Sequence, residues 1–131
     1  MNKGLQLWVN LKKEYKMVEP RYQELVSKDI PVVSKDGVTV KIISGESMGV
    51  KSPVKTYTPT MYLDFKLEPN ATFSQPTPNH YNTFLYTLEG DLFVGEDTSP
   101  TPAHHTVVFF YYCFTHNNKM LNSLNPFLLY F

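Results

Sequence analysis

Residues 60–67 read Thr-Met-Tyr-Leu-Asp-Phe-Lys-Leu, and this stretch decides the fold class. Every second residue is large and apolar: Met61, Leu63, Phe65 and Leu67. Successive side chains of a β-strand point to opposite faces of the sheet, so this alternation predicts a strand with one buried face. The residues expected to point outward are Tyr62, Asp64 and Lys66.

Shorter runs of the same kind lie on both sides of this strand. Residues 32–33 and 38–43 are rich in valine and isoleucine and flank Lys35-Asp36-Gly37, a strong signal for a hairpin turn. Residues 83–89 alternate again, and with a turn at Gly90 and a strand at 92–94 they are expected to form a second hairpin.

Three weaker signals complete the pattern of elements. Thr72 begins a brief extended piece, and His104 is expected to open another strand. Residues 45–59 predict a long irregular connection, while Pro20 suits the first turn of a short helical segment over residues 20–25. Seven or so short strands, with turns every eight to twelve residues, predict an all-β sandwich or barrel of antiparallel strands.

Composition excludes several classes of function. The chain has 131 residues, enough for one domain, and its 12 basic residues balance its 12 acidic ones. No net field therefore draws it to nucleic acid or to an anionic membrane, and no apolar run approaches the roughly 20 residues of a membrane span. Cys113 is the single cysteine and no signal sequence precedes residue 10, so an intracellular location is expected.

Four stretches together resemble the pirin family of the cupin superfamily. They are Lys-Met-Val-Glu-Pro-Arg-Tyr-Gln-Glu-Leu at 16–25, Lys-Asp-Gly-Val-Thr-Val at 35–40, Ile-Ser-Gly-Glu at 43–46 and Tyr-Leu-Asp-Phe-Lys-Leu at 62–67. The resemblance runs from Gly4 to about Val108. It implies a jelly-roll barrel, a double-stranded β-helix of two antiparallel sheets.

The resemblance also implies how the chain is divided. Residues 1–12, with alternating apolar residues from Leu5 to Leu11, correspond to the last strand of an N-terminal cupin that is missing here. Residues 13–34 correspond to the linker, and residues 35–108 to part of the pirin C-terminal cupin domain. An incomplete, truncated barrel with exposed strand edges and some self-association is therefore expected.

Residues 109–131 form an apolar tail that departs from the family pattern. A frame change or read-through would produce such a tail, and an evolved interaction segment is the alternative. Residues 107–114 read Val-Val-Phe-Phe-Tyr-Tyr-Cys-Phe, without a charge or a proline, which is typical of an aggregation-prone segment.

No metal, cofactor or catalytic residue is predicted on this chain. The cupin motif places His-x-His and then Glu ahead of a Leu-x-Gly turn; counting back from Leu88-Glu89-Gly90 puts Pro76, Pro78 and Thr83 at those positions. Adjacent residues on a strand face opposite ways, so His104 and His105 are not expected to share an ion. His80 is expected in a solvated loop and His116 in the tail. In pirins the iron ligands lie in the first cupin, upstream of Gly4.

Other candidate groups are weak. Cys113 has no basic neighbour that would hold it as a thiolate, and Ser44-Gly45-Glu46-Ser47 lacks the strand-to-helix elbow of a nucleophile. Asp64 and Glu89 are isolated carboxylates. A ligand pocket lined by aromatic residues stays open as an alternative, with Phe65, Phe84 and Tyr86 as its walls.

Three interpretations of function follow. The resemblance implies a non-catalytic cupin related to iron-binding nuclear co-regulators, with protein partners such as transcription factors of the NF-kappa-B type and a location in nucleus and cytoplasm. Pirins also resemble quercetin 2,3-dioxygenases, which implies an oxidoreductase that would need the missing iron site. The third interpretation is an inert truncated product. We favour the first as family membership.

Overall fold

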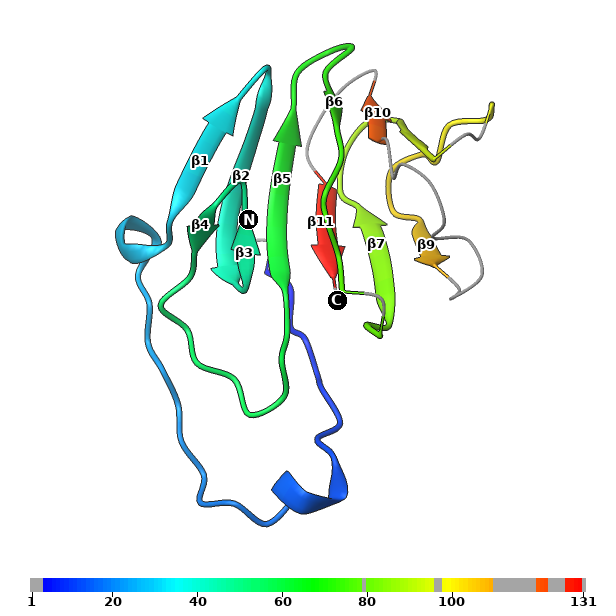
Figure 1. Cartoon of the computed structure of the whole chain (residues 1–131). Helices are drawn as coiled ribbons and strands as arrows, with labels where there is room; N and C mark the ends of the chain where they lie inside the picture. Colours follow the sequence, from blue (N-terminus) through cyan, green and yellow to red (C-terminus); the bar gives the residue numbers. More distant parts are fainter. Residues whose placement is uncertain (1–3, 79, 96–97, 110–119, 123–126, 131) are drawn as a thin grey trace.

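The computed structural model describes residues 4–78, 80–95, 98–109, 120–122 and 127–130, and in these residues it is an all-β structure (Figure 1). Two short 3-10 turns, Lys13–Tyr15 and Ser27–Asp29, precede the sheets. The strands are β1 Val32–Lys35, β2 Val38–Ser44, β3 Glu46–Ser47, β4 Val50–Lys51, β5 Tyr62–Leu67, β6 Thr72–Phe73, β7 Thr83–Thr87, β8 Leu92–Val94, β9 Thr106–Phe109, β10 Met120–Asn122 and β11 Phe127–Tyr130.

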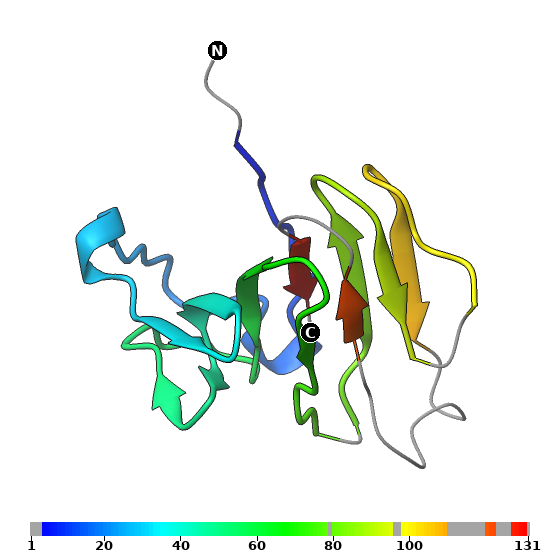
Figure 2. The ribbon, with the colours of Figure 1, turned by 90° about the horizontal axis from the view of Figure 1, so that it is seen from above.

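The strands form three antiparallel sheets, seen from above in Figure 2. The largest has the order β1-β2-β5-β11-β7-β9, the second has the order β6-β10-β8, and β3 and β4 form a small hairpin. Neighbours in the sheet are often distant in sequence, which is how a jelly roll differs from a simple meander. The predicted fold class, an antiparallel all-β jelly roll, is confirmed.

The β1–β2 hairpin forms at the predicted turn. Asp36 and Gly37 have φ angles of 49° and 77°, so both central residues are left-handed. A type I′ turn requires this conformation, and its twist matches that of the flanking strands. The pairing Lys35↔Val38 closes the hairpin directly at the turn.

The core lies on one face of the large sheet, where β2 and β5 pair side by side. The pairs Val38↔Leu67, Val40↔Phe65 and Ile42↔Leu63 are almost completely buried, and Leu85 of β7 and Leu92 of β8 complete the cluster. The alternation predicted for residues 60–67 is therefore confirmed. Each such large side chain contributes about 1.5–3 kcal/mol on burial.

Residues 4–11 contain no regular element in this structure, so their assignment as the last strand of an absent N-terminal cupin stays a prediction. A strand needs a neighbour that completes its backbone hydrogen bonds, and none of the described residues pairs with this segment. Leu5, Trp8 and Val9 are consequently exposed, Trp8 to 86%, whereas Leu7 and Leu11 are partly covered.

The predicted helical turn at residues 20–25 is wrong. This segment is extended, and its side chains bind the loop that precedes β5. The Gln23 amide donates to the Lys55 carbonyl at 2.7 Å and accepts from the Lys55 amide at 3.0 Å. The Arg21 guanidinium lies 4.2 Å from the centre of the Tyr57 ring. These contacts replace the backbone hydrogen bonds that a helix would have made.

The predicted hairpin between residues 83–89 and 92–94 does not form. β7 pairs with β9 and β11 in the large sheet, whereas β8 pairs with β10 in the other. The Thr87 hydroxyl donates to the Pro102 carbonyl at 2.5 Å and accepts from the His105 amide at 3.1 Å, so the end of β7 is bound to the 102–105 turn. His104 has a φ of 63°, and the next strand begins at Thr106 instead of His104.

Two described segments of the apolar tail pair into the sheets. β10 lies between β6 and β8, and β11 lies between β5 and β7. Most of the predicted aggregation-prone segment at residues 107–114, together with Cys113 and His116, lies outside the described residues. In the described part of the chain, no helix reaches the length and apolar character that crossing a membrane requires.

Candidate functional site

A cleft of about 510 Å³ lies between the β3–β4 hairpin and residues 75–78. Pro76 and Pro78, the positions at which the cupin motif would place histidines, line this cleft. A second hollow of about 390 Å³ adjoins it and shares Glu46, Met61 and Pro78 with it. Together they form the candidate site, called here the hairpin cleft.

Gly45 allows the hairpin cleft to form. Its φ is +85°, and a Cβ atom at this position would lie 2.7 Å from Met61 Cγ and 3.0 Å from Met61 Cα. Only glycine tolerates both the left-handed backbone and this close approach. Met61, the residue before β5, is thereby brought against the end of β2, where it lines both hollows.

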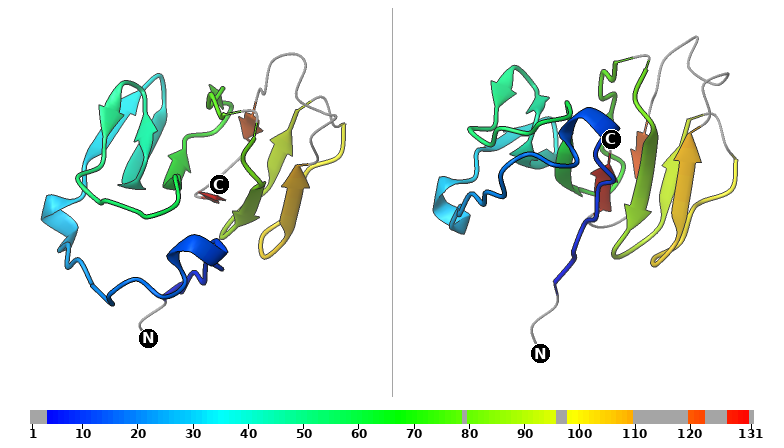
Figure 3. Two further views of the ribbon diagram at one scale, coloured as in Figure 1. Left: turned by 60° about the horizontal axis from the view of Figure 1, so that its bottom comes forward. Right: turned by 90° about the horizontal axis from the view of Figure 1, so that it is seen from below.

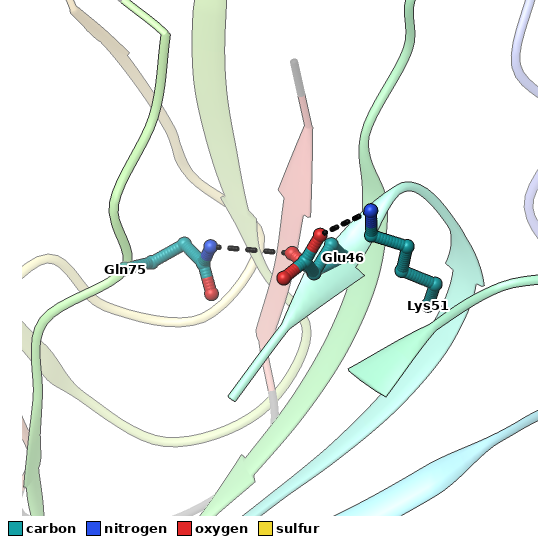
Figure 4. Close-up of polar contacts among 3 residues, drawn as sticks. All are labelled: Glu46, Lys51 and Gln75. Carbon is teal, nitrogen blue, oxygen red and sulfur yellow. Dashed lines mark hydrogen bonds and ion pairs between the residues drawn. The ribbon is translucent and has the colours of Figure 1, made fainter. Parts of the chain in front are cut away.

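A buried amide fixes the opposite wall. Gln75 is 3% exposed; its Nε2 donates to the Pro76 carbonyl at 2.9 Å and to the Glu46 carbonyl at 3.4 Å (Figure 4). Its Oε1 accepts from the hydroxyl of Ser47, which is 2% exposed, at 2.7 Å. Gln75 therefore binds residues 75–78 to β3 and has a structural role.

Among the described residues, Glu46 and Lys51 are the charged ones that line the cleft. They are opposite partners on β3 and β4, and their Oε2 and Nζ atoms lie 3.4 Å apart (Figure 4). The side chains are 49% and 77% exposed, so both remain accessible to solvent. Tyr81 lines the smaller hollow, where burial raises the pKa of its hydroxyl above the ordinary value.

The donor set around the cleft does not fit an iron centre, which takes imidazoles and one carboxylate. None of the histidines in the described part of the chain lines either hollow. His80 is exposed and contacts Tyr81, while His104 and His105 lie in the exposed turn before β9. The described residues contain no group of three His, Cys, Asp or Glu placed to hold a metal ion. Whether the whole chain lacks metal stays a prediction.

The described residues do not form the aromatic pocket that the sequence left open. Phe65 is fully buried and faces the core, and Leu85 of β7 faces the core with it. Phe84 and Tyr86 flank Leu85 and therefore point to the opposite face of the sheet. The expected pocket cannot form because its three walls lie on two faces.

The other candidate groups are engaged in structural contacts. The Ser44 hydroxyl donates to the Thr60 carbonyl at 3.0 Å, so it is not an exposed nucleophile. Asp64 lies on the outer face of the sheet, 3.8 Å from Lys41 Nζ. Burial raises the pKa of the Asp64 carboxyl, and the charge of Lys41 lowers it by less.

The sequence-based interpretation missed the Glu46–Lys51 pair and the role of Gln75. The signal for the ion pair was present, since Met48 and Gly49 form a left-handed two-residue turn that sets the strands of a hairpin opposite each other. No local signal pointed to Gln75, because its partners lie 28 and 29 residues away.

Comparison with known proteins identifies close relatives. The Pirin C-terminal cupin domain matches residues 62–124, a stretch that extends beyond Val108. Human Pirin is 58% identical over 107 residues, which are 80% of this chain and 37% of that protein. The tomato (Solanum lycopersicum) Pirin-like protein is also 58% identical over 107 residues, covering 81% of this chain and 37% of its own length.

Solved structures are also similar to this chain in fold and sequence. GK1651 from Geobacillus kaustophilus has a TM-score of 0.83 and 40% identity, covering 94% of this chain and 51% of that one. A quercetin 2,3-dioxygenase from Acinetobacter baumannii has a TM-score of 0.81 and 27% identity, covering 94% of this chain and 43% of the enzyme. The chain thus spans about 37% of the length of the curated relatives that it matches.

Proposed function

The chain belongs to the pirin family of the cupin superfamily, and from this premise we propose that it is a non-catalytic cupin domain that acts through contacts with other proteins. The family resemblance points to transcription factors of the NF-kappa-B type as the partner class, and to the nucleus and cytoplasm as the compartments. Iron in such a protein would be held by another part of the family's fold.

The proposal that this domain is non-catalytic rests on the chemistry of the side chains that line the hairpin cleft. Pro76 and Pro78 have side chains without a donor atom, and Thr83 is 5% exposed. Glu46 is the one carboxylate that the described residues place on the cleft wall, and no described imidazole lies beside it. An oxygenase would need two or three imidazoles here to hold iron and leave positions open for oxygen.

Exposed apolar side chains on residues 4–26 support the proposal that the domain binds other proteins. Trp8, Met17 and Tyr22 are 86%, 94% and 86% exposed, and a partner that covered them would gain the free energy of burying their apolar surface. The segment loops away from the sheets as an extended strap (Figure 3). The contact between Arg21 and Tyr57 fixes part of it on the domain.

The alternative is a dioxygenase, favoured by the similarity to the Acinetobacter baumannii quercetin 2,3-dioxygenase. One experiment separates the two functions. The chain is loaded anaerobically with Fe(II), and oxygen uptake with quercetin is measured beside binding to a DNA-bound NF-kappa-B-type factor by fluorescence anisotropy. We expect binding without turnover. Quercetin-dependent oxygen uptake would reverse the assignment, and absence of binding would refute the proposed partner class.

A matched pair of variants tests the strap. Replacing Trp8, Met17 and Tyr22 together with serine should weaken binding at least about tenfold, since interface energy is concentrated in large apolar anchors. Val32→Ser removes an apolar side chain that is 52% exposed on β1 and should leave binding unchanged. Equal losses in both proteins would mean that the strap is not the contact surface.

A further inference from the structure

The hairpin cleft presents two opposite charges side by side to solvent. The β3–β4 hairpin places the Glu46 carboxylate and the Lys51 ammonium 3.4 Å apart, and both side chains line the 390 Å³ hollow (Figure 4). Each group has spare capacity, because a carboxylate accepts several hydrogen bonds and an ammonium donates three. A surface ion pair of this kind contributes little to stability on its own.

We propose that this hollow binds a small zwitterion, an α-amino acid with an apolar side chain. The ammonium and carboxylate of an α-amino acid are joined through a single carbon, so they can lie against the Glu46 carboxylate and the Lys51 ammonium at once. A simple anion would meet repulsion from Glu46, and a simple cation would meet repulsion from Lys51. The paired charges therefore select a ligand that carries both.

Most neighbouring hydroxyl groups are already engaged in hydrogen bonds and are not free to bind a ligand. The Ser44 hydroxyl donates to the Thr60 carbonyl, and the Ser52 hydroxyl donates to the Ile43 carbonyl at 2.7 Å. The Tyr81 hydroxyl, by contrast, makes no hydrogen bond within the described part of the chain. It is the donor that would reach the ligand carboxylate together with Lys51.

The remaining wall suits an apolar side chain. Apolar residues line the hollow beside the ion pair: Val54, Pro59, Met61 and Pro78. Its volume of about 390 Å³ lies within the range of small-molecule sites, roughly 300–1,000 Å³. The charged pair then fixes the orientation of the ligand, and the apolar wall contributes by burying its side chain.

Titration of the isotope-labelled chain with L-leucine, followed by two-dimensional NMR, tests this site. We expect saturable shifts at Glu46, Lys51 and Tyr81 with a Kd of about 1 mM or tighter. L-Leucinamide, which lacks the carboxylate, and N-acetyl-L-leucine, which lacks the ammonium, should each bind about tenfold more weakly. Absence of saturable shifts, or equal binding of either analogue, would overturn the proposal.

Variants locate the site without reference to protein partners, so this test and the test of the proposed function can fail separately. Lys51→Met and Glu46→Gln should each weaken leucine binding about tenfold. Lys35→Met disrupts a comparable exposed pair, Lys35–Asp36 at 4.0 Å on the β1–β2 turn, and should change nothing. Exchanging the charges, with Glu46→Lys and Lys51→Glu combined, should restore most of the affinity for leucine that either single variant loses. Unchanged binding in Lys51→Met would refute the assignment.

Discussion

Ser47 and Gln75 lie 28 residues apart in sequence, yet the Ser47 hydroxyl donates a 2.7 Å hydrogen bond to the Gln75 amide oxygen, and both side chains are buried. This contact joins β3 to the segment that leads into β7. It therefore connects the two walls of the hairpin cleft, and its loss should affect both stability and the shape of the cleft.

We expect Gln75→Leu to lower the free energy of unfolding by about 1–3 kcal/mol, because the Ser47 hydroxyl and the Glu46 carbonyl lose a buried partner. Ser47→Ala should act in the same direction. Urea denaturation of both single variants and of the double variant measures the coupling, for which about 0.5–3 kcal/mol is expected.

Gln23→Leu is the matched control for this pair. Gln23 also makes two hydrogen bonds through its amide, to the backbone of Lys55, but it is exposed. Water can replace those bonds, so the loss should be at most about 1 kcal/mol. A Gln23 variant as unstable as the Gln75 variant would show that burial of the amide is not the source of the effect.

Gly45 and Gly49 provide a second comparison. Both have left-handed backbones, with φ of +85° and +77°, but only Gly45 would direct a Cβ into Met61; nothing lies within 4 Å at Gly49. Gly49→Ala should cost about 1–2 kcal/mol from backbone strain alone. Gly45→Ala should cost a further 1–3 kcal/mol or so from overpacking, measured by thermal and urea unfolding. Equal losses would mean that Met61 moves aside freely.

Asp64 should make stability fall as the pH rises. Burial raises its pKa in the folded chain above the ordinary 3.8, and Lys41 offsets this only in part. Between 3.8 and the raised value, the folded state binds more protons than the unfolded state, so the free energy of unfolding decreases with increasing pH. Asp64→Asn should abolish this decrease, and Lys41→Met should enlarge it.

Urea unfolding across the acidic range, with NMR titration of the Asp64 carboxyl, checks this prediction. Asp36→Asn removes a carboxyl that is 81% exposed on the β1–β2 turn, and it should leave the decrease in place. If stability instead rises through the same interval in the parent and not in Asp64→Asn, the Lys41 charge outweighs burial.

The purified chain should hold no stoichiometric iron. Pro76, Pro78 and Thr83 stand where the cupin motif has its ligands, and the histidines described in the structure line neither hollow of the cleft. Elemental analysis after anaerobic loading with Fe(II) measures this directly. One tightly bound iron per chain that is lost on His104→Ala or His105→Ala would contradict it and favour the dioxygenase.

Local patterns predicted the fold well, because strand alternation and the Asp36-Gly37 turn act over a few residues. At residues 4–11 the alternation meets no neighbouring strand in the described chain, and no regular element forms there. Local patterns failed at residues 20–25, which are extended because Gln23 binds the backbone of Lys55. They failed again after β7, where the Thr87 side chain binds the 102–105 turn and the chain changes sheets. The hairpin cleft depends on Gln75 contacting β3, and no short-range pattern encodes such a contact.

In the described part of the chain, β1 and β9 are the two edge strands of the large sheet, and they are expected to differ in their tendency to pair with other chains. β1 ends at Lys35, whereas β9 reads Thr-Val-Val-Phe and carries no charge. Each has one strongly exposed valine, Val32 at 52% and Val108 at 54%. Uncharged edges pair with other chains, and lysine on an edge opposes this.

We therefore expect Val108→Lys to raise the solubility of the chain more than Val32→Lys does, measured as the saturation concentration and the sedimentation profile. Val32 and Val108 are almost equally exposed, so a difference between the two variants reflects the lysine that β1 already carries and β9 lacks. Unfolding in urea should show that both variants stay folded. If Val32→Lys is the more effective change, or if removing residues 1–11 abolishes aggregation while Val108→Lys does not, then the strap or the β1 edge drives self-association and the ranking of the edges is wrong.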